Sequence, residues 1–383
     1  MIYMIAFFLC LFSVLSIYSN REVRLLSIFF LLFLIVIFCG NNENPDYVGY
    51  KLKYDSIKNH NATDFIFSNP YVGFNMFQFV CHAIGLSYQQ FLFIVALLGY
   101  TLIIDTLHYF HANMNYVLLL YLFYPFFYDV IQIKNFLAMS IVIYSIRYLL
   151  NNTKSATLKY VVLIILASLF HIVSVSYLLL LLTKLKRKVP LYILAFLSSV
   201  SVAILIRLRL INLSSVASIL FGDLLPQEKF GYFNPVINYG FIVIDGIMLY
   251  CILILEFISH KLGSISMNVN GICMQKSLQY KLVILMRDCN FLLLIMLFPM
   301  NFVNPNFFRI FRNFFILNYT CFYIGREYLK KESPDYTPEM TVFFDAAVYV
   351  FVIGLFLYDF VLYENKTILK PMFTQNIFLD LLR

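Results

Sequence analysis

Residues 158–183 read LKYVVLIILASLFHIVSVSYLLLLLT, an apolar run with His171 at its centre. At 1.5 Å per residue, such a run is long enough to cross the ~30 Å hydrocarbon core of a membrane as a helix. An ionisable side chain at that depth costs free energy and is a candidate functional residue by default. The run therefore predicts a membrane protein and also marks a place to look for its site.

The whole chain has the same apolar character. Of its 383 residues, 62% are hydrophobic and only 13% are charged, and the mean hydropathy is +0.82. Soluble domains average about 45–50% apolar and about 25% charged residues. The sequence predicts an all-α, polytopic integral membrane protein with about 12 transmembrane or re-entrant helices in one domain, residues 1–383. The predicted helices are 2–18, 24–39, 71–85, 91–109, 116–129, 135–150, 158–183, 190–208, 237–259, 282–300, 309–325 and 341–363.

The net charge of +8 does not indicate nucleic-acid binding, because most Lys and Arg residues lie in short loops between apolar segments. Cytoplasmic loops of membrane proteins carry this excess of positive charge. The basic stretches 151–159, 184–188, 260–281 and 326–331 are therefore predicted to be cytoplasmic. The polar stretches 40–70, 209–235 and 301–308 are predicted to be external loops.

The run around His171 lies between two of these basic stretches, so both of its ends are predicted inside. Two passes would leave only ~18 Å each, which is too short for the hydrocarbon core. Either one basic loop breaks the positive-inside rule, or the run is a re-entrant hairpin with His171 near its apex. In the first case His171 is a structural residue; in the second it lines a cavity.

The first external loop contains NPDYVGYKLKYD, residues 44–55, in which Tyr47, Tyr50 and Tyr54 share one face of a predicted helix. Asp46 stands where that helix would start, a position that suits a negative charge. One interpretation is a carboxylate beside aromatic faces that stack on sugar rings. The alternative is an interfacial amphipathic helix with an N-terminal Asp.

Three cations are predicted near the outer face. Lys134 and Asn135 stand at the start of a helix whose other end is basic, and a cation at a helix N-terminus is a ready anion site. Arg309 and Arg312 share a helix face after an external turn, and two guanidinium groups match a diphosphate through forked hydrogen bonds. The alternative in each case is a side chain that reaches to the membrane interface.

Five further ionisable residues lie in or beside apolar segments and receive no role: Asp105, Asp245, Glu256, Arg287 and Asp288. Arg287 and Asp288 are adjacent, so on a helix their side chains are expected to point in different directions and to need other partners.

Together these motifs resemble the EpsG family, which groups with the Wzy-type polysaccharide polymerases. Members typically combine an Asp-Tyr-rich outer loop, a Gly-Phe pair opening a helix, an Ile-Arg-Asn/Gln-x-x-Ala motif, a basic turn, an Ala-Ser-x-Phe-His stretch, an Arg pair and a Pro-containing tail. The matching residues here are Asp46-Tyr47, Gly73-Phe74, IKNFLA at 133–138, the turn 151–159, ASLFH at 167–171, Arg309 with Arg312, and Lys370-Pro371. This chain departs from that pattern at Lys134, where an Arg is usual, and at Tyr71, where an acidic residue is common.

The resemblance implies a GT-C-like glycosyltransferase at the outer face of the bacterial inner membrane, with polyprenyl-diphosphate-linked glycans as donor and acceptor. For this chemistry our hypothesis assigns residues to diphosphate (Lys134, Asn135, Arg309, Arg312), to catalysis (Asp46 as base, His171 as second candidate) and to sugars (Tyr47, Tyr50, Tyr54). No cofactor and no metal are expected, because no carboxylate cluster with metal-ligand spacing is visible. Membrane lipids, a chain-length regulator and a flippase are candidate partners. A flippase or other transporter and a membrane glycan acyltransferase are the alternative functions.

Overall fold

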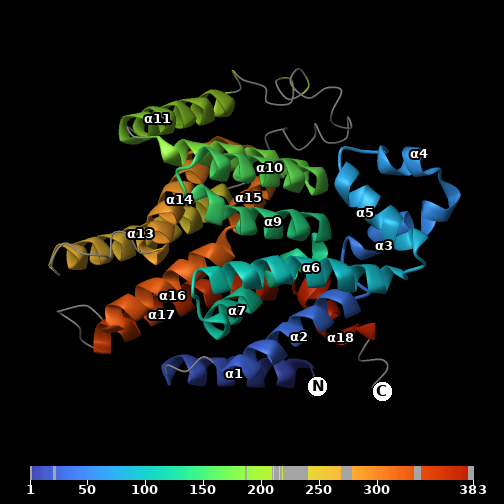
Figure 1. Cartoon of the computed structure of the whole chain (residues 1–383), viewed down its shortest axis with the longest axis horizontal. Coiled ribbons are helices and arrows are strands. Elements are labelled where there is room, and N and C mark those ends of the chain that lie inside the picture. Colours follow the sequence, from blue (N-terminus) through green and yellow to red (C-terminus); the bar gives the residue numbers. More distant parts are fainter. Residues whose placement is uncertain are drawn as a thin grey trace. The chain divides into compact units, whose positions relative to one another are not determined.

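The computed structural model describes residues 2–19, 23–185, 188–208, 240–268, 278–331 and 338–377, and the single positions 210, 215 and 218. The elements of this part of the chain are helices (Figure 1). Within it, five helices are long and apolar enough to cross a membrane: Tyr88–Tyr109, Pro190–Arg207, Gly240–Gly263, Leu278–Val303 and Glu339–Tyr363. The prediction of a helical membrane protein is confirmed. The total of about 12 spans, the GT-C-like architecture and the single domain stay predictions.

The chain divides into two compact units, the first of which comprises Met1–Tyr148, Thr157–Val175 and Phe315–Arg383. Its elements before the first gap are α1 (Ile2–Tyr18), α2 (Arg24–Gly40), α3 (Tyr47–Asp55), η1 (Ser56–Asn59), α4 (Ala62–Ile66), α5 (Val72–Ala83), α6 (Tyr88–Tyr109), α7 (Met114–Phe123), α8 (Phe126–Ile131) and α9 (Ile133–Leu149). Most of α10 (Lys154–Phe170) follows, and then come α16 (Phe315–Lys331), α17 (Pro338–Phe356), η6 (Leu357–Tyr363), η7 (Asn365–Leu369) and α18 (Lys370–Thr374).

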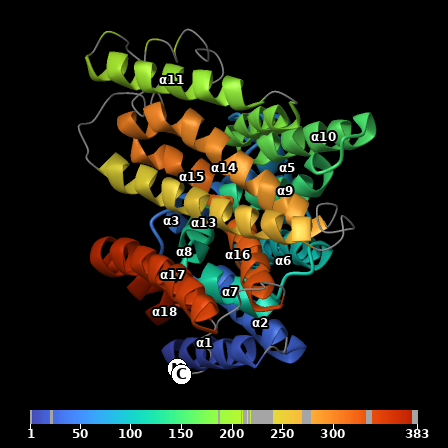
Figure 2. The ribbon, with the colours of Figure 1, turned by 90° about the vertical axis from the view of Figure 1, so that its left-hand side faces the viewer.

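The second unit comprises Leu149–Ala156 and Ser176–Phe314. It contains most of η2 (Ile172–Lys184), then α11 (Lys188–Arg207), α13 (Gly240–Asn268), α14 (Leu278–Val303), η5 (Pro305–Phe308) and α15 (Arg309–Arg312). Helix α14 packs against both α11 and α13 (Figure 2). The predicted external loop 209–235 lies outside the described residues apart from single positions, as do residues 269–277 of the predicted cytoplasmic stretch 260–281.

The turn between α5 and α6 is built from local sequence signals. Gly85 has a φ of 82°, a left-handed conformation that glycine adopts without steric cost. The backbone N–H of Leu86 donates to the carbonyl of Cys81 at 3.1 Å, which closes the end of α5. Ser87 then caps α6, since its Oγ accepts from the backbone N–H of Gln90 while the Gln90 side chain accepts from the N–H of Ser87.

Three predicted helices are each broken in two. The run 116–129 is interrupted at Pro125, which has no N–H to continue a helix, so α7 ends at Phe123 and α8 begins at Phe126. The run 309–325 is interrupted between α15 and α16. The run 158–183 is broken at His171, where α10 ends and the 3₁₀ helix η2 follows. Such long 3₁₀ runs are uncommon and often mark a hinge or strain.

Candidate functional site

The ammonium of Lys134 lies among three aromatic rings. Its Nζ is 4.2 Å from the ring centroid of Tyr71, 5.0 Å from that of Tyr50 and 5.7 Å from that of Phe74. A cation within about 6 Å of a ring is attracted by the ring's quadrupole, by about 0.5–1 kcal/mol at exposed sites and about 2 kcal/mol when desolvated. Lys134 is half-buried. We call Lys134 and these three rings the lysine cage.

The cage brings the first predicted outer loop onto the start of α9. Lys134 is the second residue of that helix, which confirms its predicted place at a helix start. Tyr50 comes from α3, while Tyr71 immediately precedes α5 and Phe74 lies in its first turn. Phe74 is fully buried, and its ring lies 6.2 Å from that of Tyr50. Asn135 follows Lys134 and is also buried.

His171 joins the cage through Tyr71. Their ring centroids are 5.7 Å apart, with an angle of 31° between the ring planes. His171 follows the last residue of α10, and only 8% of its surface is exposed. Helices α5 and α10 can approach here because Gly73 has no side chain: a Cβ at Gly73 would lie 2.8 Å from Cβ of Leu169 and 3.1 Å from its carbonyl oxygen. The Gly of the Gly-Phe pair is therefore explained by close helix packing.

The two departures from the family pattern meet in this cage. Tyr71 supplies the ring nearest to Lys134. An acidic side chain opposite an arginine would form an ion pair, whereas a tyrosine opposite a lysine forms a cation–π contact.

The predicted helix in the loop is confirmed as α3, but its three tyrosines have different surroundings. Asp46 stands exposed at the start of the helix, and its carbonyl accepts a hydrogen bond from the N–H of Tyr50 at 3.1 Å. Tyr47 is largely buried, and its hydroxyl accepts from Gln89. Tyr54 is 1% exposed, and its hydroxyl donates to a backbone carbonyl. Of the three rings, only that of Tyr50 is in the cage, and Tyr54 offers no exposed face to a sugar.

Arg309 and Arg312 lie in the second unit and form the two ends of α15, so their predicted shared helix is confirmed. The turn before it is fixed by Asn304, whose Oδ1 accepts from the N–H of Asn306 at 2.9 Å. Arg309 donates through Nε to the carbonyl of Asn306 at 3.1 Å. Arg312 is buried, while Arg309 is half-exposed.

The sequence reading missed Tyr177, which fastens the end of this arginine helix. The Tyr177 hydroxyl donates to the carbonyl of Ile310 at 2.8 Å and accepts from Nδ2 of Asn313 at 2.9 Å. Both side chains are buried. Tyr177 is distant in sequence from its partners and lies in a run of leucines, so its hydroxyl in an apolar context is the only signal that the sequence offers.

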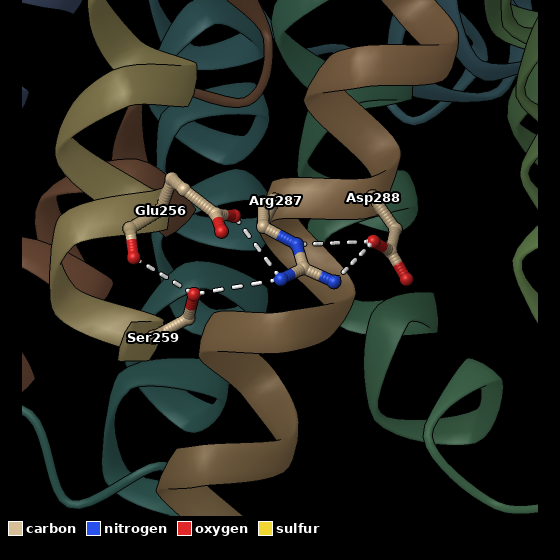
Figure 3. A network of polar contacts seen from close by, with 4 residues as sticks. All are labelled: Glu256, Ser259, Arg287 and Asp288. Atoms are coloured by element: carbon tan, nitrogen blue, oxygen red, sulfur yellow. Dashed lines mark hydrogen bonds and ion pairs between the residues drawn. The ribbon is translucent and has the colours of Figure 1, made fainter. Parts of the chain in front are cut away.

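A polar network links α13 to α14 in the same unit (Figure 3). Nη1 of Arg287 lies 3.1 Å from a Glu256 carboxylate oxygen, and its Nη2 lies 3.0 Å from Oδ1 of Asp288. Ser259 accepts a longer bond from the same guanidinium. The expectation that Arg287 needs a partner other than its neighbour is confirmed, because its guanidinium reaches Glu256 and Ser259 on α13. The expectation that the two side chains point apart was wrong, because the long arginine side chain also bonds Asp288.

Other carboxylates predicted to lie near apolar segments also have partners. Asp105 accepts from Arg147 at 2.6 Å, and Asp245 accepts from Asn301 at 2.9 Å. In the described part of the chain, no group of three His, Cys, Asp or Glu side chains is arranged to hold a metal ion.

Comparison with known proteins gives one match. The model of the EpsG family matches residues 24–374, from the start of α2 to the end of α18. No curated protein and no solved structure matches the chain. The matched range includes the lysine cage, His171 and the arginine helix.

Proposed function

The chain belongs to the EpsG family of Wzy-type polysaccharide polymerases, and from this premise we propose that it joins polyprenyl-diphosphate-linked oligosaccharide repeat units. The reaction would take place at the outer face of the bacterial inner membrane and would produce O-antigen, capsule or exopolysaccharide. The observation that carries the proposal is the lysine cage: a half-buried cation at a helix start, held by aromatic rings beside His171.

The proposed reaction is a displacement at a sugar. A hydroxyl oxygen of the acceptor repeat unit attacks the anomeric carbon of the donor glycan. The bond from that carbon to the diphosphate oxygen breaks, and the polyprenyl diphosphate leaves with the electron pair. The hydroxyl proton passes to a base. Stabilising the charge of a leaving group is commonly the largest single contribution to catalysis, and a positioned base contributes about 10²–10⁴-fold.

We assign the leaving diphosphate to Lys134, Asn135, Arg309 and Arg312. The rings of the lysine cage restrict where the Lys134 ammonium can point, and an ammonium group is a hydrogen-bond donor of the kind that phosphate oxygens accept from. The N-terminal position of Lys134 and Asn135 on α9 adds the positive end of the helix dipole. Two guanidinium groups one turn apart supply forked donors.

We assign the base to Asp46, with His171 as the second candidate. The exposed carboxylate of Asp46 stands one turn before Tyr50, whose ring is in the cage and is the one we expect to stack on a sugar. His171 lies at a break in the helix, against Tyr71. We further propose that the reaction needs no metal, and that a chain-length regulator and a flippase act alongside this protein.

Polymerisation by the purified protein in liposomes, with lipid-linked repeat units as substrate, tests these assignments. We expect Lys134→Ala and Arg309→Ala to abolish polymer while the protein still inserts. Lys51→Ala is the matched control, because Lys51 is an exposed lysine on α3 that forms an ion pair with Asp55 at 3.8 Å. Full-length glycan from the Asp46→Asn protein would show that Asp46 is not the base. Polymerisation that stops with EDTA and returns with Mg²⁺ would show that the reaction needs a metal.

A deletion strain distinguishes the alternative functions. Loss of a polymerase leaves single repeat units at the cell surface, whereas loss of a flippase leaves none. Loss of an acyltransferase changes glycan acylation and leaves chain length intact. A glycan profile of either of the latter two kinds would refute the proposed function.

A further inference from the structure

Lys53 is a second enclosed cation in the first outer loop. It lies on α3 and is half-buried. Its Nζ donates to Oδ1 of Asn75 at 2.7 Å and lies 5.2 Å from the ring centroid of Phe65. Among the described residues, no carboxylate oxygen lies within 4.0 Å of this ammonium. A charge that is partly removed from water without an opposite charge is costly, so Lys53 requires an explanation.

Asn75 is set in place to face this lysine. Its side chain is fully buried, and its Nδ2 donates to the carbonyl of Ile66 at 3.0 Å and to Oδ1 of Asn69 at 3.1 Å. Because the NH₂ end of the amide is committed to these acceptors, the oxygen is the end that meets Lys53. An amide oxygen carries only a partial charge and compensates the ammonium incompletely.

An enclosed ammonium is ordinarily compensated by a nearby acidic side chain, but the surroundings of Lys53 do not provide one. Helix α3 packs against η1, α5 and α6, and Phe65 of α4 lies under the ammonium. The titratable groups on these elements, together with Asp46 just before α3, are Asp46, Tyr47, Tyr50, Lys51, Tyr54, Asp55, Lys58, Asp64, Cys81, His82, Tyr88, Tyr100, Asp105, His108 and Tyr109. Asp55 pairs with Lys51 and Asp105 with Arg147, and none of the carboxylates in this set forms an ion pair with Lys53. Burial lowers the pKa of Lys53 to about 8. Its side chain is therefore mostly a charged ammonium at pH 7 and mostly a neutral amine above pH 8.

Lys53 is attached to the same two helices that build the lysine cage. Tyr50 lies one turn before it on α3, and Phe74 immediately precedes its partner Asn75 on α5. The rings of Tyr50 and Phe74 are 6.2 Å apart, and both face the ammonium of Lys134. The pair of helices therefore holds two ammonium groups within one continuous set of contacts.

We propose that Lys53 is a second anion-binding residue of this site and takes an anionic oxygen of the substrate. That oxygen is either a phosphate oxygen of the lipid diphosphate or a carboxylate oxygen of an acidic sugar. Its place in a polymerisation reaction rests on the proposed function, whereas anion binding at Lys53 does not. A bound anion supplies the missing opposite charge, favours the protonated amine and raises the pKa of Lys53.

Trace acetylation of the full-length protein in detergent tests the binding directly. Only the neutral amine reacts, so acetylation of Lys53, located by mass spectrometry, rises with pH through its pKa of about 8. The probes are inorganic pyrophosphate and glucuronate. A rise in pKa to about 9 reduces the neutral fraction at pH 8 about fivefold, and acetylation with it. Protection by pyrophosphate assigns the diphosphate, and protection by glucuronate assigns an acidic sugar.

Lys51 is an internal control on the same helix, with 47% of its side chain exposed. Equal protection of Lys51 and Lys53 would show a general salt effect and would overturn the proposal. Acetylation of Lys53 that neither probe changes would also overturn it. Because these measurements use the natural chain, their outcome does not depend on whether a Lys53 variant folds.

Substrate kinetics then link the binding to turnover. We expect Lys53→Gln to raise KM for the lipid-linked substrate about tenfold, equal to about 1.4 kcal/mol, with kcat little changed. Lys53→Arg keeps the charge and should retain a KM near that of the natural protein, while Lys51→Gln is the neutral control. If the natural protein is active and Lys53→Gln has the same KM as Lys51→Gln, the role of Lys53 is refuted while the proposed polymerase function is not. If the natural protein makes no polymer, the proposed function fails instead.

Discussion

Replacing Gly73 by alanine should damage the site by pushing two helices apart. The added Cβ would lie 2.8 Å from Cβ of Leu169, whereas ordinary contact begins at 3.4 Å, so the helices must separate by 3.4 − 2.8 = 0.6 Å. Backbone atoms of Leu169 also lie at 3.1 and 3.2 Å, so rotation of a side chain cannot relieve the overlap. Overpacking of this kind costs about 1–3 kcal/mol, offset in part by the ~1 kcal/mol by which alanine favours a helix.

The functional effect should exceed the loss of stability. Tyr71 lies two residues before Gly73, and His171 lies two residues after Leu169, so the displacement acts where their rings meet. A displacement of about 1 Å at a reacting centre can cost about 10²-fold, and we expect Gly73→Ala to lower polymer formation at least about tenfold.

The assay is polymer yield per inserted protein, together with the melting temperature in detergent. Gly49→Ala is the matched control, because Gly49 lies on α3 with nothing within 4 Å of its added Cβ. A Gly73→Ala protein with the yield and melting temperature of the Gly49→Ala protein would refute the packing argument.

Three further predictions test particular contacts. Asp345→Asn should destabilise the first unit by about 3 kcal/mol, measured by melting, because it removes the buried carboxylate that accepts from Nε of Arg326 at 2.9 and 3.0 Å and leaves Glu327, at 3.2 Å from Nη1, as the carboxylate beside that guanidinium. An unchanged melting temperature contradicts this. Tyr177→Phe should cost about 1 kcal/mol, because it removes one hydrogen bond to the carbonyl of Ile310 and one from Asn313, and it should reduce polymer formation. Full activity would show that the arginine helix does not need this anchor. Lys134→Arg should be tolerated in polymerisation, and adding Tyr71→Asp to it should be less harmful than Tyr71→Asp alone; additive losses would show that the two positions are not coupled.

Much of the helical framework follows from hydropathy. The predicted segment 91–109 lies within α6, and 24–39 lies within α2, because long apolar runs bounded by polar residues leave few alternatives. The break at Pro125 could have been predicted, since proline lacks the N–H that a helix needs. The break at His171 was only one of two alternatives in the sequence: the basic stretches on both sides of the run suggested a turn near His171, but no proline or glycine marks it.

The site was predictable only in part. Lys134 and Tyr50 could be named because a charge in an apolar segment and a periodic aromatic face are visible in sequence. Their meeting depends on the predicted outer loop, residues 40–70, folding onto the start of α9, which no local pattern determines. Tyr71 was noticed only as a departure from a family pattern, and its contact with Lys134 gives that departure a physical meaning. Lys53 was overlooked because a lysine on an apparent surface helix gives no sign of burial.

The buried amide of Asn75 determines which residues must be exchanged together when the predicted outer loop is replaced by that of a relative. It holds the carbonyl of Ile66, the side chain of Asn69 and the ammonium of Lys53, so the loop and the helix that follows it form one transferable block. A chimera whose junction falls between Ile66 and Asn75 would separate Asn75 from its hydrogen-bond partners. Each buried polar group left without its partner would cost about 1–3 kcal/mol of stability. Residues 47–75 should therefore be moved together if the glycan that is polymerised is to be changed without losing the fold.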